Sequence, residues 1–465
     1  MRILYTFLLT FFLSFGSIVV GYAQIVQNKN FSFGSYGRVG VGFSPAIPGH
    51  TGVPLNLRGQ GPIGGRLEEQ DYMELVGAYH FKPVTNDIDT TFINAQVLLS
   101  VFSTGGPFIG NVTSQSAQGL VFRIPEFFVE AQRIMGSKWS AWVGARYDRS
   151  DDVHIIDYYY FDDHSSQGFG IIRENTSVSF IFPAVRDSTA HYPPYTFITS
   201  VNGVPTQSLR QRFIGIFEHS FDLGDGKALS LLAEWHRLAN ARGDSLRYSA
   251  DGGWVAGVKY NTPLATAREG SFNQLSVRFG RGIANGGDGG STRTWLTYGA
   301  PDEETQEYNG AYSVSVVEHF LLNLSDRFSL NGYSLLLKSK GAADTDHKAP
   351  DFLGREIFNR KTDFAIGFRS FWYLKDWFHL LNEAHYTIRK DGEQPKATMV
   401  KFSVAPTIVP TAQRSPWARP HLRFVVSLAR YNKFARENLY SPYLQRAGHQ
   451  KWGLYGGVKA EWWIY

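Results

Sequence analysis

The sequence predicts an all-β fold, a transmembrane antiparallel β-barrel, and three observations carry this prediction. Several segments of about ten residues alternate between apolar and polar side chains, which is typical of strands with lipid on one face and a polar lumen on the other. The chain has 47 glycines, 15% aromatic residues and no cysteine, a composition typical of folds with many short strands. Its connections come in two sizes, as expected for short periplasmic turns and long external loops.

The alternation is clearest in residues 378–389, although residues 229–236 and 452–465 show it too. The apolar face, interrupted only by Asn382, carries Phe378, Leu380, Ala384, Tyr386 and Ile388, and the polar face carries His379, Glu383, His385, Thr387 and Arg389. Strands of soluble sandwiches also alternate, but they average only about 5–6 residues. The length of these segments therefore favours a barrel.

Short polar turns at residues 224–226, 325–327 and 374–377 separate neighbouring alternating segments. Longer polar or glycine-rich stretches alternate with them, at residues 44–65, 103–119, 191–208, 284–309, 339–361 and 432–450. No linker or internal repeat marks a second domain. We therefore expect one barrel domain over residues 24–465.

Residues 1–23 have the form of a signal peptide. A basic start at Met1–Arg2 precedes an apolar run up to Val20, and Gly21-Tyr22-Ala23 supplies the small-x-small pattern of a cleavage site. An uncleaved anchor is the alternative. No later apolar run approaches the roughly 20 residues of a spanning helix, so an exported protein, either soluble or embedded as strands, is expected.

Composition also excludes several functions. A formal net charge of +5 over 465 residues, without a basic run, argues against nucleic acid as a partner. The absence of cysteine excludes thiolate metal sites, thiol nucleophiles and disulfides. The Asp and His residues near position 157 match no metal-ligand spacing, so neither a metal nor another cofactor is expected.

Residues 142–163 combine charges of both signs, among them Arg149, Asp152 and Asp157, with three successive tyrosines. A strand with two dry faces could not bury these charges without a large desolvation cost. The stretch therefore predicts a strand with one wet face. The alternative role of its charges is a salt-bridge network that stiffens a lumen wall and touches no ligand.

This stretch resembles the maltoporin family of outer-membrane sugar channels, which carries a similar Arg-x-Asp-Val-His-Ile-Ile-Asp-Tyr-Tyr-Tyr run. Residues 31–38 resemble the family's mature N-terminal strand, and Arg66 with Tyr72-Met73-Glu74 resembles its next strand. Further matches occur at residues 251–254, 270–273, 416–420 and 461–463, in the family's order over essentially the whole mature chain.

The resemblance implies an 18-stranded barrel, a homotrimer in the bacterial outer membrane and a third external loop, at about residues 162–170, that folds inward. It implies an aromatic slide for the sugar, formed by Tyr36, Tyr72, Phe272, Trp417 and Trp463. It implies a polar track formed by Arg38, Arg66, Glu74, Arg149, Asp152, Asp157 and Asn273, with Tyr159 narrowing the channel opposite the slide. Flat rings suit the C–H faces of a pyranose, and paired Arg and carboxylate groups suit its hydroxyls.

Two positions depart from the family pattern. Pro125 stands where the family has an arginine, and Arg123, two residues upstream on the same strand face, is a candidate substitute. The second external loop, residues 105–119, has no tryptophan, and Phe108 is its only aromatic residue. The outermost sugar site of the family is therefore left open here.

The function expected from these observations is passive diffusion of maltose and maltodextrins through an outer-membrane channel, without cofactor or catalysis. The alternatives are a porin for another sugar, such as sucrose, and a non-specific porin. An outer-membrane hydrolase is the rival from another class, but the sequence shows no convincing Ser/His/Asp set on one strand face.

Overall fold

The computed structural model of the chain describes residues 30–69, 71–81, 91–103, 120–183, 196–201, 204–209, 212–239, 250–265, 267–286, 295–350 and 356–464. The expected signal peptide and the second external loop with Phe108 lie outside these residues.

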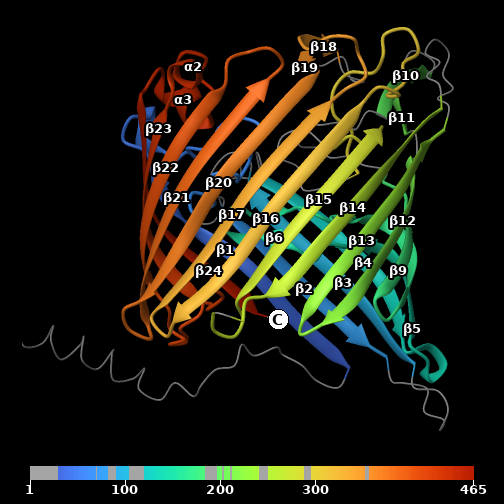
Figure 1. Cartoon of the computed structure of the whole chain (residues 1–465), viewed down its shortest axis with the longest axis horizontal. Coiled ribbons are helices and arrows are strands. Elements are labelled where there is room, and N and C mark those ends of the chain that lie inside the picture. The colour runs from blue at the N-terminus through green and yellow to red at the C-terminus, as the bar shows by residue number, and fades with distance from the viewer. Residues whose placement is uncertain are drawn as a thin grey trace, which may run out of the picture.

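Eighteen strands of the described chain form one antiparallel sheet, in which each strand pairs with the next along the chain. The last of them, β24, pairs with the first, β1, so the sheet closes into a barrel (Figure 1). The strands are β1 (Phe31–Phe43), β2 (Tyr72–His80), β3 (Phe92–Ser103), β4 (Leu120–Gln132), β5 (Trp139–Arg146), β8 (Ser166–Arg173), β9 (Thr176–Ile181), β12 (Arg212–Gly224), β13 (Lys227–Leu238), β14 (Asp251–Pro263), β15 (Phe272–Gly282), β16 (Tyr312–Ser325), β17 (Phe328–Lys340), β20 (Arg360–Tyr373), β21 (Phe378–Asp391), β22 (Ala397–Ile408), β23 (His421–Tyr431) and β24 (Trp452–Ile464). The barrel prediction is confirmed.

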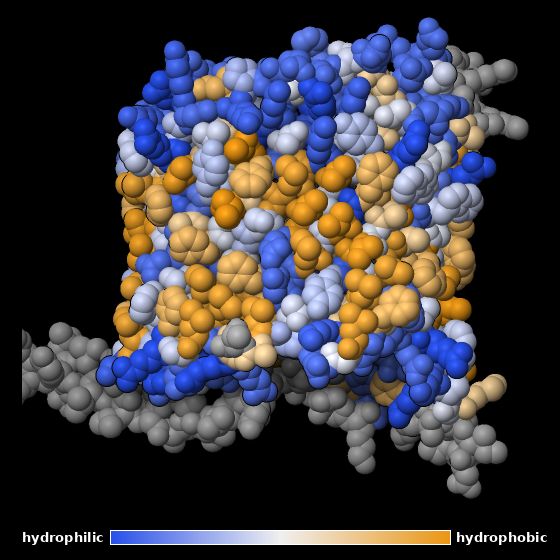
Figure 2. Space-filling model, viewed as in Figure 1, coloured by the Kyte–Doolittle hydropathy of each residue, from blue (hydrophilic) through white to orange (hydrophobic). Residues whose placement is uncertain are grey.

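The alternation in sequence becomes an inner and an outer face of the wall. On β21, His379, Glu383 and His385 are buried inside the barrel, whereas Tyr386 is exposed on the outside. Neighbouring outward residues are apolar along most strands, and Figure 2 shows the resulting hydrophobic band between two hydrophilic rims. This band is the surface that the lipid of a membrane covers.

Short turns join the strands at one rim, including the predicted turns at residues 224–226, 325–327 and 374–377. Because β21 runs away from this rim and β22 returns to it, the connection of residues 409–420 lies there too. The other rim carries the long connections and their small elements (Figure 1). These are η1 (Pro48–His50), the hairpins β10 (Thr196–Val201) with β11 (Val204–Leu209) and β18 (Lys348–Pro350) with β19 (Glu356–Phe358), and the helices α2 (Lys433–Glu437) and α3 (Pro442–Ala447). The 3-10 turn η3 (Ile134–Gly136) joins β4 to β5.

None of the helices among the described residues combines the length and the apolar character that a bilayer-spanning helix requires.

The expectation of one continuous strand over residues 142–163 is wrong. The wall strand β5 ends at Arg146, and the chain then leaves the wall until β8, which pairs with β5. The intervening segment, residues 147–165 (loop 3), contains β6 (Asp152–Val153), the 3-10 turn η4 (His154–Ile156) and β7 (Tyr158–Tyr159). Asp157 has a φ of 46°, and this left-handed residue reverses the chain between β6 and β7.

Loop 3 folds into the lumen because apolar side chains on its inner side find an apolar patch on the barrel wall. Val153, Ile155 and Ile156 are buried in one cluster with Val255 of β14 and Val317 of β16. Each such side chain stabilises the packing by about 1.5–3 kcal/mol. The inward loop is therefore residues 147–165, and the expected position at residues 162–170 is wrong because β8 already begins at residue 166.

Polar contacts fix the same loop to the inner wall. The Tyr160 hydroxyl donates to Gln274 Oε1 of β15 at 2.6 Å, and Lys259 of β14 forms an ion pair with Asp151. Loop 3 thus crosses the lumen from β5 to the strands β14 and β15.

The first connection, residues 44–71 (loop 1), fills another part of the lumen. Leu55, Leu57 and Ile63 are fully buried, and Glu68 forms an ion pair of 3.1 Å with Lys401 on the inner face of β22. Arg66 belongs to this loop, so its expected position on the same strand as Tyr72 is wrong. Loops 1 and 3 therefore both occupy space inside the barrel.

Candidate functional site

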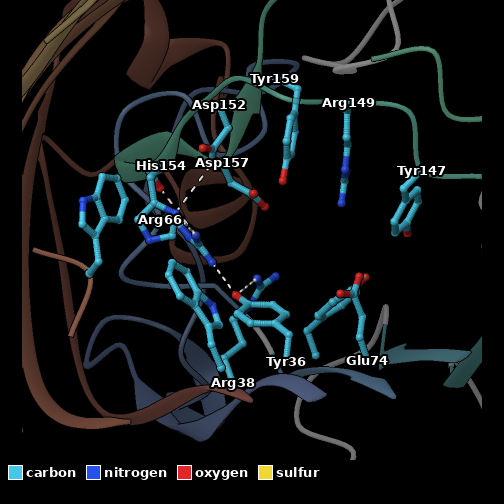
Figure 3. A pocket seen from close by; sticks show the side chains of 13 residues that line it. Tyr36, Arg38, Arg66, Glu74, Tyr147, Arg149, Asp152, His154, Asp157 and Tyr159 are labelled. Atoms are coloured by element: carbon cyan, nitrogen blue, oxygen red, sulfur yellow. Dashed lines mark hydrogen bonds and ion pairs between the residues drawn. The ribbon is translucent and has the colours of Figure 1, made fainter. Parts of the chain in front are cut away.

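A cavity of about 320 Å³ lies in the lumen where loops 1 and 3 approach the inner faces of β1, β2 and β24. It also reaches the connection of residues 409–420. Its lining consists of Tyr36, Arg38, Arg66, Tyr72, Glu74, Tyr147, Arg149, Asp152, His154, Asp157, Tyr159, Trp417 and Trp463. Figure 3 shows Tyr159 and Arg149 of loop 3 pointing across this space toward Tyr36 and Glu74 on the wall.

Four aromatic rings line one side of the cavity. Tyr36 of β1 and Trp463 of β24 are direct partners across neighbouring strands, with ring centroids 6.4 Å apart. Tyr36 also lies 5.8 Å from the ring of Tyr72 on β2, because strand pairing places inward side chains on adjacent strands beside each other. Trp417, from the connection of residues 409–420, completes the group.

His154 of loop 3 lies between the two tryptophans. Its ring meets Trp417 and Trp463 edge-on, with centroid distances of 5.5 and 5.3 Å. Its Nε2 atom is 3.0 Å from Arg419 Nη2, which can only donate, and its Nδ1 atom lies 3.4 Å from Arg66 Nη1 and 3.5 Å from Asp152 Oδ2. Burial, opposed by Asp152 and reinforced by Arg66, lowers the pKa of His154 to about 4. His154 is therefore neutral at physiological pH.

The polar side begins with two arginines that share one carboxylate. Arg66 and Arg38 lie 2.8 and 3.2 Å from Glu69, and Arg66 Nη2 donates to the Tyr36 hydroxyl at 2.7 Å. Burial tends to raise the pKa of Asp157, but the nearby guanidinium groups of Arg66, Arg38 and Arg149 outweigh burial and hold that pKa below its ordinary value. The carboxylate of Asp157 is therefore ionised and available as an acceptor.

A second charge network has the buried carboxylate of Glu461 at its centre. Glu461 lies 3.2 Å from Arg423 and 3.0 Å from His421 on β23, and 3.6 and 3.7 Å from Arg419 and Arg66. A buried carboxylate requires such partners because an isolated buried charge is very costly. Sequence alternation places Glu461 on the polar face of β24, but its partners come from distant segments and were not foreseen.

Arg149 is held between two tyrosines, with its guanidinium 4.1 Å from the ring centroids of both Tyr147 and Tyr159. Tyr147 was not among the expected residues. It directly follows the last residue of β5, where the chain leaves the wall. On the facing wall, Tyr72 donates a hydrogen bond to Glu74. Arginine and carboxylate therefore face each other across the open space.

Comparison with known families decides the identity of the chain. The model of the family described as LamB porin matches residues 31–463, which is nearly the whole described barrel. The chain belongs to the LamB porin family. This is the maltoporin family, and the chain is accordingly an outer-membrane porin channel of bacteria.

Solved structures are similar to this LamB porin at low sequence identity. OccD3 (OpdP) of Pseudomonas aeruginosa is 9% identical, with 94% of this chain and 91% of that chain covered and a TM-score of 0.45. OpdK of the same organism, solved with vanillate, is 11% identical, with 94% and 98% covered and a TM-score of 0.43. OmpT, an outer membrane protein of Vibrio cholerae, is 7% identical, with 95% and 99% covered and a TM-score of 0.38.

In this LamB porin, all site residues expected from sequence line the cavity except Phe272 and Asn273. Phe272 faces the lumen nearer the short-turn rim, where its ring meets His319 edge-on at 5.1 Å. Its partner across the strands, Leu321, lines a second cavity that also contacts Trp417. Trp417 therefore lies between the two spaces.

Asn273 does not face the lumen, so its expected place in the polar track is wrong. It alternates with Phe272 and Gln274, which both point inward, and its amide donates to Glu318 of β16 at 2.8 Å. Glu318 lies between two buried inward residues, Val317 and His319. Both polar side chains are therefore on the outer face of the barrel.

Arg123 faces the lumen, since it lies between the outward residues Phe122 and Ile124. A register shift opposite Leu98 and Ser100 marks a bulge in β4 between Arg123 and Glu126. Arg123 pairs with Ser100, and its guanidinium lies 4.7 Å from the ring centroid of Phe102. Arg123 is outside the cavity lining.

Within the described residues, no three His, Asp or Glu side chains are grouped so that they could hold a metal ion.

Proposed function

We propose that this LamB porin is a passive channel for maltose and maltodextrins, which move along an aromatic slide flanked by a polar track. The observation that carries the proposal is the shared cavity. Four aromatic rings line one side of it, and Arg149, Asp152 and Asp157 of loop 3 face them across a space of about 320 Å³.

The slide consists of Tyr72, Tyr36, Trp463 and Trp417 in the cavity, with Phe272 nearer the short-turn rim. A pyranose ring has apolar C–H faces that pack on flat aromatic surfaces. The centroid distances of 5.8 and 6.4 Å between neighbouring rings allow a sugar unit to contact the next ring before it leaves the last. A chain of glucose units thus advances in small steps.

The track consists of Arg38, Arg66 and Arg149 as donors and Glu74, Asp152 and Asp157 as acceptors. Most of these groups already have polar or aromatic partners, as Arg66 has in Glu69 and Tyr36. Sugar hydroxyls then exchange with existing hydrogen bonds, and each exchange contributes only about 0.5–1.5 kcal/mol. Weak successive sites favour release and therefore rapid flux.

Tyr159 narrows the passage opposite the slide and holds the sugar against the rings. Its stacking on Arg149 limits its freedom to swing away. The same proposal includes cleavage of residues 1–23 as a signal peptide, a mature barrel of residues 24–465 assembled as a homotrimer, and transport without a cofactor or catalysis.

Single-channel current in planar bilayers tests the proposal. Maltose, maltotriose and maltohexaose should block the ion current with affinity that rises with chain length, and sucrose and raffinose should block weakly. Tighter block by sucrose would make this a porin for another sugar. Equal and negligible block by all five would make it a non-specific porin.

A further inference from the structure

One buried cation lies apart from the sugar site, at the end of loop 3. His164 has a relative exposure of 1%, and its Nε2 atom is 2.9 Å from Glu234 Oε1 on the inner face of β13. Its Nδ1 atom is 3.3 Å from Glu218 Oε1 on the inner face of β12. Each ring nitrogen therefore meets a carboxylate of the barrel wall.

The charge of His164 follows from the hydrogen-bond pattern around it. The second oxygen of Glu234 is 2.7 Å from His236 Nε2, and His236 Nδ1 is 2.6 Å from Arg212 Nη2. Because arginine only donates, His236 accepts at Nδ1, carries its hydrogen on Nε2 and is neutral. The ring of His164 meets wall carboxylates instead. With carboxylate oxygens at both nitrogens, it is an imidazolium.

The charges around His164 agree with this assignment. The titratable groups that face it are Glu218 on β12, Glu234 and His236 on β13, and Asp148 and Asp162 on loop 3 itself. Burial alone disfavours the imidazolium, but Glu234 and Glu218 outweigh burial and raise the pKa of His164 to about 10.

The backbone of His164 closes the base of loop 3. Its N–H donates to the carbonyl of Asp148 at 2.7 Å and to that of Asp162 at 2.8 Å. The two ends of the loop are thereby joined at the residue whose ring is bound to the wall. Arg149, which stacks on Tyr159, follows Asp148 directly, so the depth of these side chains in the lumen depends on this joint.

The same network continues away from the loop. Arg212 also donates to Thr297 Oγ1 and to the carbonyl of Ile283, both at 2.9 Å, in the long connection between β15 and β16. One chain of buried polar contacts therefore joins loop 3, two wall strands and an external loop.

We propose that His164 is the positioning residue of loop 3: its imidazolium, held between Glu218 and Glu234, keeps the loop at a fixed depth across the lumen and thereby sets the ion conductance. The proposal concerns ion flow alone and does not depend on which solute the porin prefers.

The first test compares H164Q with the wild-type porin in planar bilayers without sugar. Glutamine retains polarity but cannot neutralise two carboxylates, so loop 3 should move. Single-channel conductance should rise roughly twofold, with larger current noise, because the loop crosses the lumen through which ions pass. The matched control is H219Q, since His219 lies on the opposite face of β12 and contacts Thr176 instead. It should behave as the wild type does.

The second test separates positioning from a general loss of stability. In wild-type porin, conductance should rise reversibly as pH increases through about 10, where the imidazolium loses its proton. H164Q should lack this step. Glu218 is partly exposed, so E218Q should fold normally, and with one carboxylate removed the step should move to lower pH by about one unit.

Two results would overturn the proposal. One is H164Q channels with wild-type conductance and noise. The other is an alkaline step of the same midpoint in wild type, H164Q and E218Q, which would assign it to tyrosine or lysine groups elsewhere. If H164Q does not insert into bilayers, the midpoint pH of the conductance step in E218Q decides the question.

Discussion

The hydroxyl of Tyr36 accepts a hydrogen bond of 2.7 Å from the guanidinium of Arg66. Tyr36 belongs to the first wall strand and Arg66 to loop 1, so one contact joins the aromatic side of the cavity to its charged side. Arg38 donates to the same hydroxyl at 3.1 Å. The ring of Tyr36 is thus held in place by the groups that face the solute.

Replacing Tyr36 separates stacking from hydrogen bonding. Tyr36→Phe keeps the ring but removes the acceptor, and we expect maltotriose affinity to fall about two- to tenfold, since a lost hydrogen bond costs about 0.5–1.5 kcal/mol. Tyr36→Ala also removes the stacking surface and should reduce affinity further. Titration of current block measures both. Equal affinities in all three proteins would remove Tyr36 from the binding surface.

Trp417→Ala should weaken block by maltohexaose about tenfold, because a ring contact contributes about 0.5–1.5 kcal/mol beyond its buried area. Ion conductance and trimer assembly should not fall, since Trp417 lies on a connection rather than on the wall. Trp372→Ala is the control, because Trp372 is exposed on the outer face of β20. Weaker block in Trp372→Ala would contradict the assignment. Block of wild-type strength in Trp417→Ala would contradict it too.

Tyr159→Ala should widen the passage and raise single-channel conductance, and it should free one face of Arg149. Conductance in potassium chloride without sugar measures the change. Tyr79→Ala, which shortens an exposed outward side chain on β2, serves as the comparison. An unchanged conductance would place the narrowest point elsewhere.

Sugar block should be independent of pH between about 5 and 8. The pKa of His154 is lowered to about 4, so the ring remains neutral throughout this range and gains a proton only in stronger acid. Protonation then adds a positive charge beside Arg66 and Arg419, which should displace the loop and weaken block. Block measured from about pH 3 to 8 tests this, and a transition near the ordinary histidine value of about 6.5 would refute it.

The outward pair Asn273 and Glu318 gives a test that distinguishes the structure from the family pattern. The double variant N273L/E318L should bind maltotriose as tightly as the wild type. It should also be more stable by about 1–2 kcal/mol, because charge on the lipid face of a barrel is unfavourable. Urea unfolding in lipid vesicles measures stability, and a loss of sugar affinity would return Asn273 to the lumen.

The strands of the barrel wall can be predicted from the sequence, whereas the loops that fold into the lumen largely cannot. Alternation reports which face of a strand is wet, so the inner and outer sides of β13, β21 and β24 are predictable from residues alone. Alternation does not report whether a segment has neighbouring strands. The charges of residues 142–163 predict a strand with one wet face, yet residues 147–163 cross the lumen, because Val153 and Ile155 meet an apolar patch of wall that local sequence does not reveal.

The residues of the cavity are likewise only partly predictable from the sequence. Resemblance to known sequences locates Arg149, Asp152 and Asp157, but Glu461 and its partners Arg66 and Arg419 are far apart in the chain and meet only in the folded barrel. Asn273 was misplaced because an offset of one residue moves a side chain to the opposite face of a strand.

The closing pair of strands has a consequence for how the porin folds. Tyr36 pairs with Trp463 and Arg38 with Glu461 across the seam between β1 and β24, the first and last strands of the described sheet. An unclosed sheet, however complete its other hairpins, holds these residues at opposite edges. The cavity forms its full lining only after the two edges of the sheet have paired, so ligand binding reports the closure of the barrel.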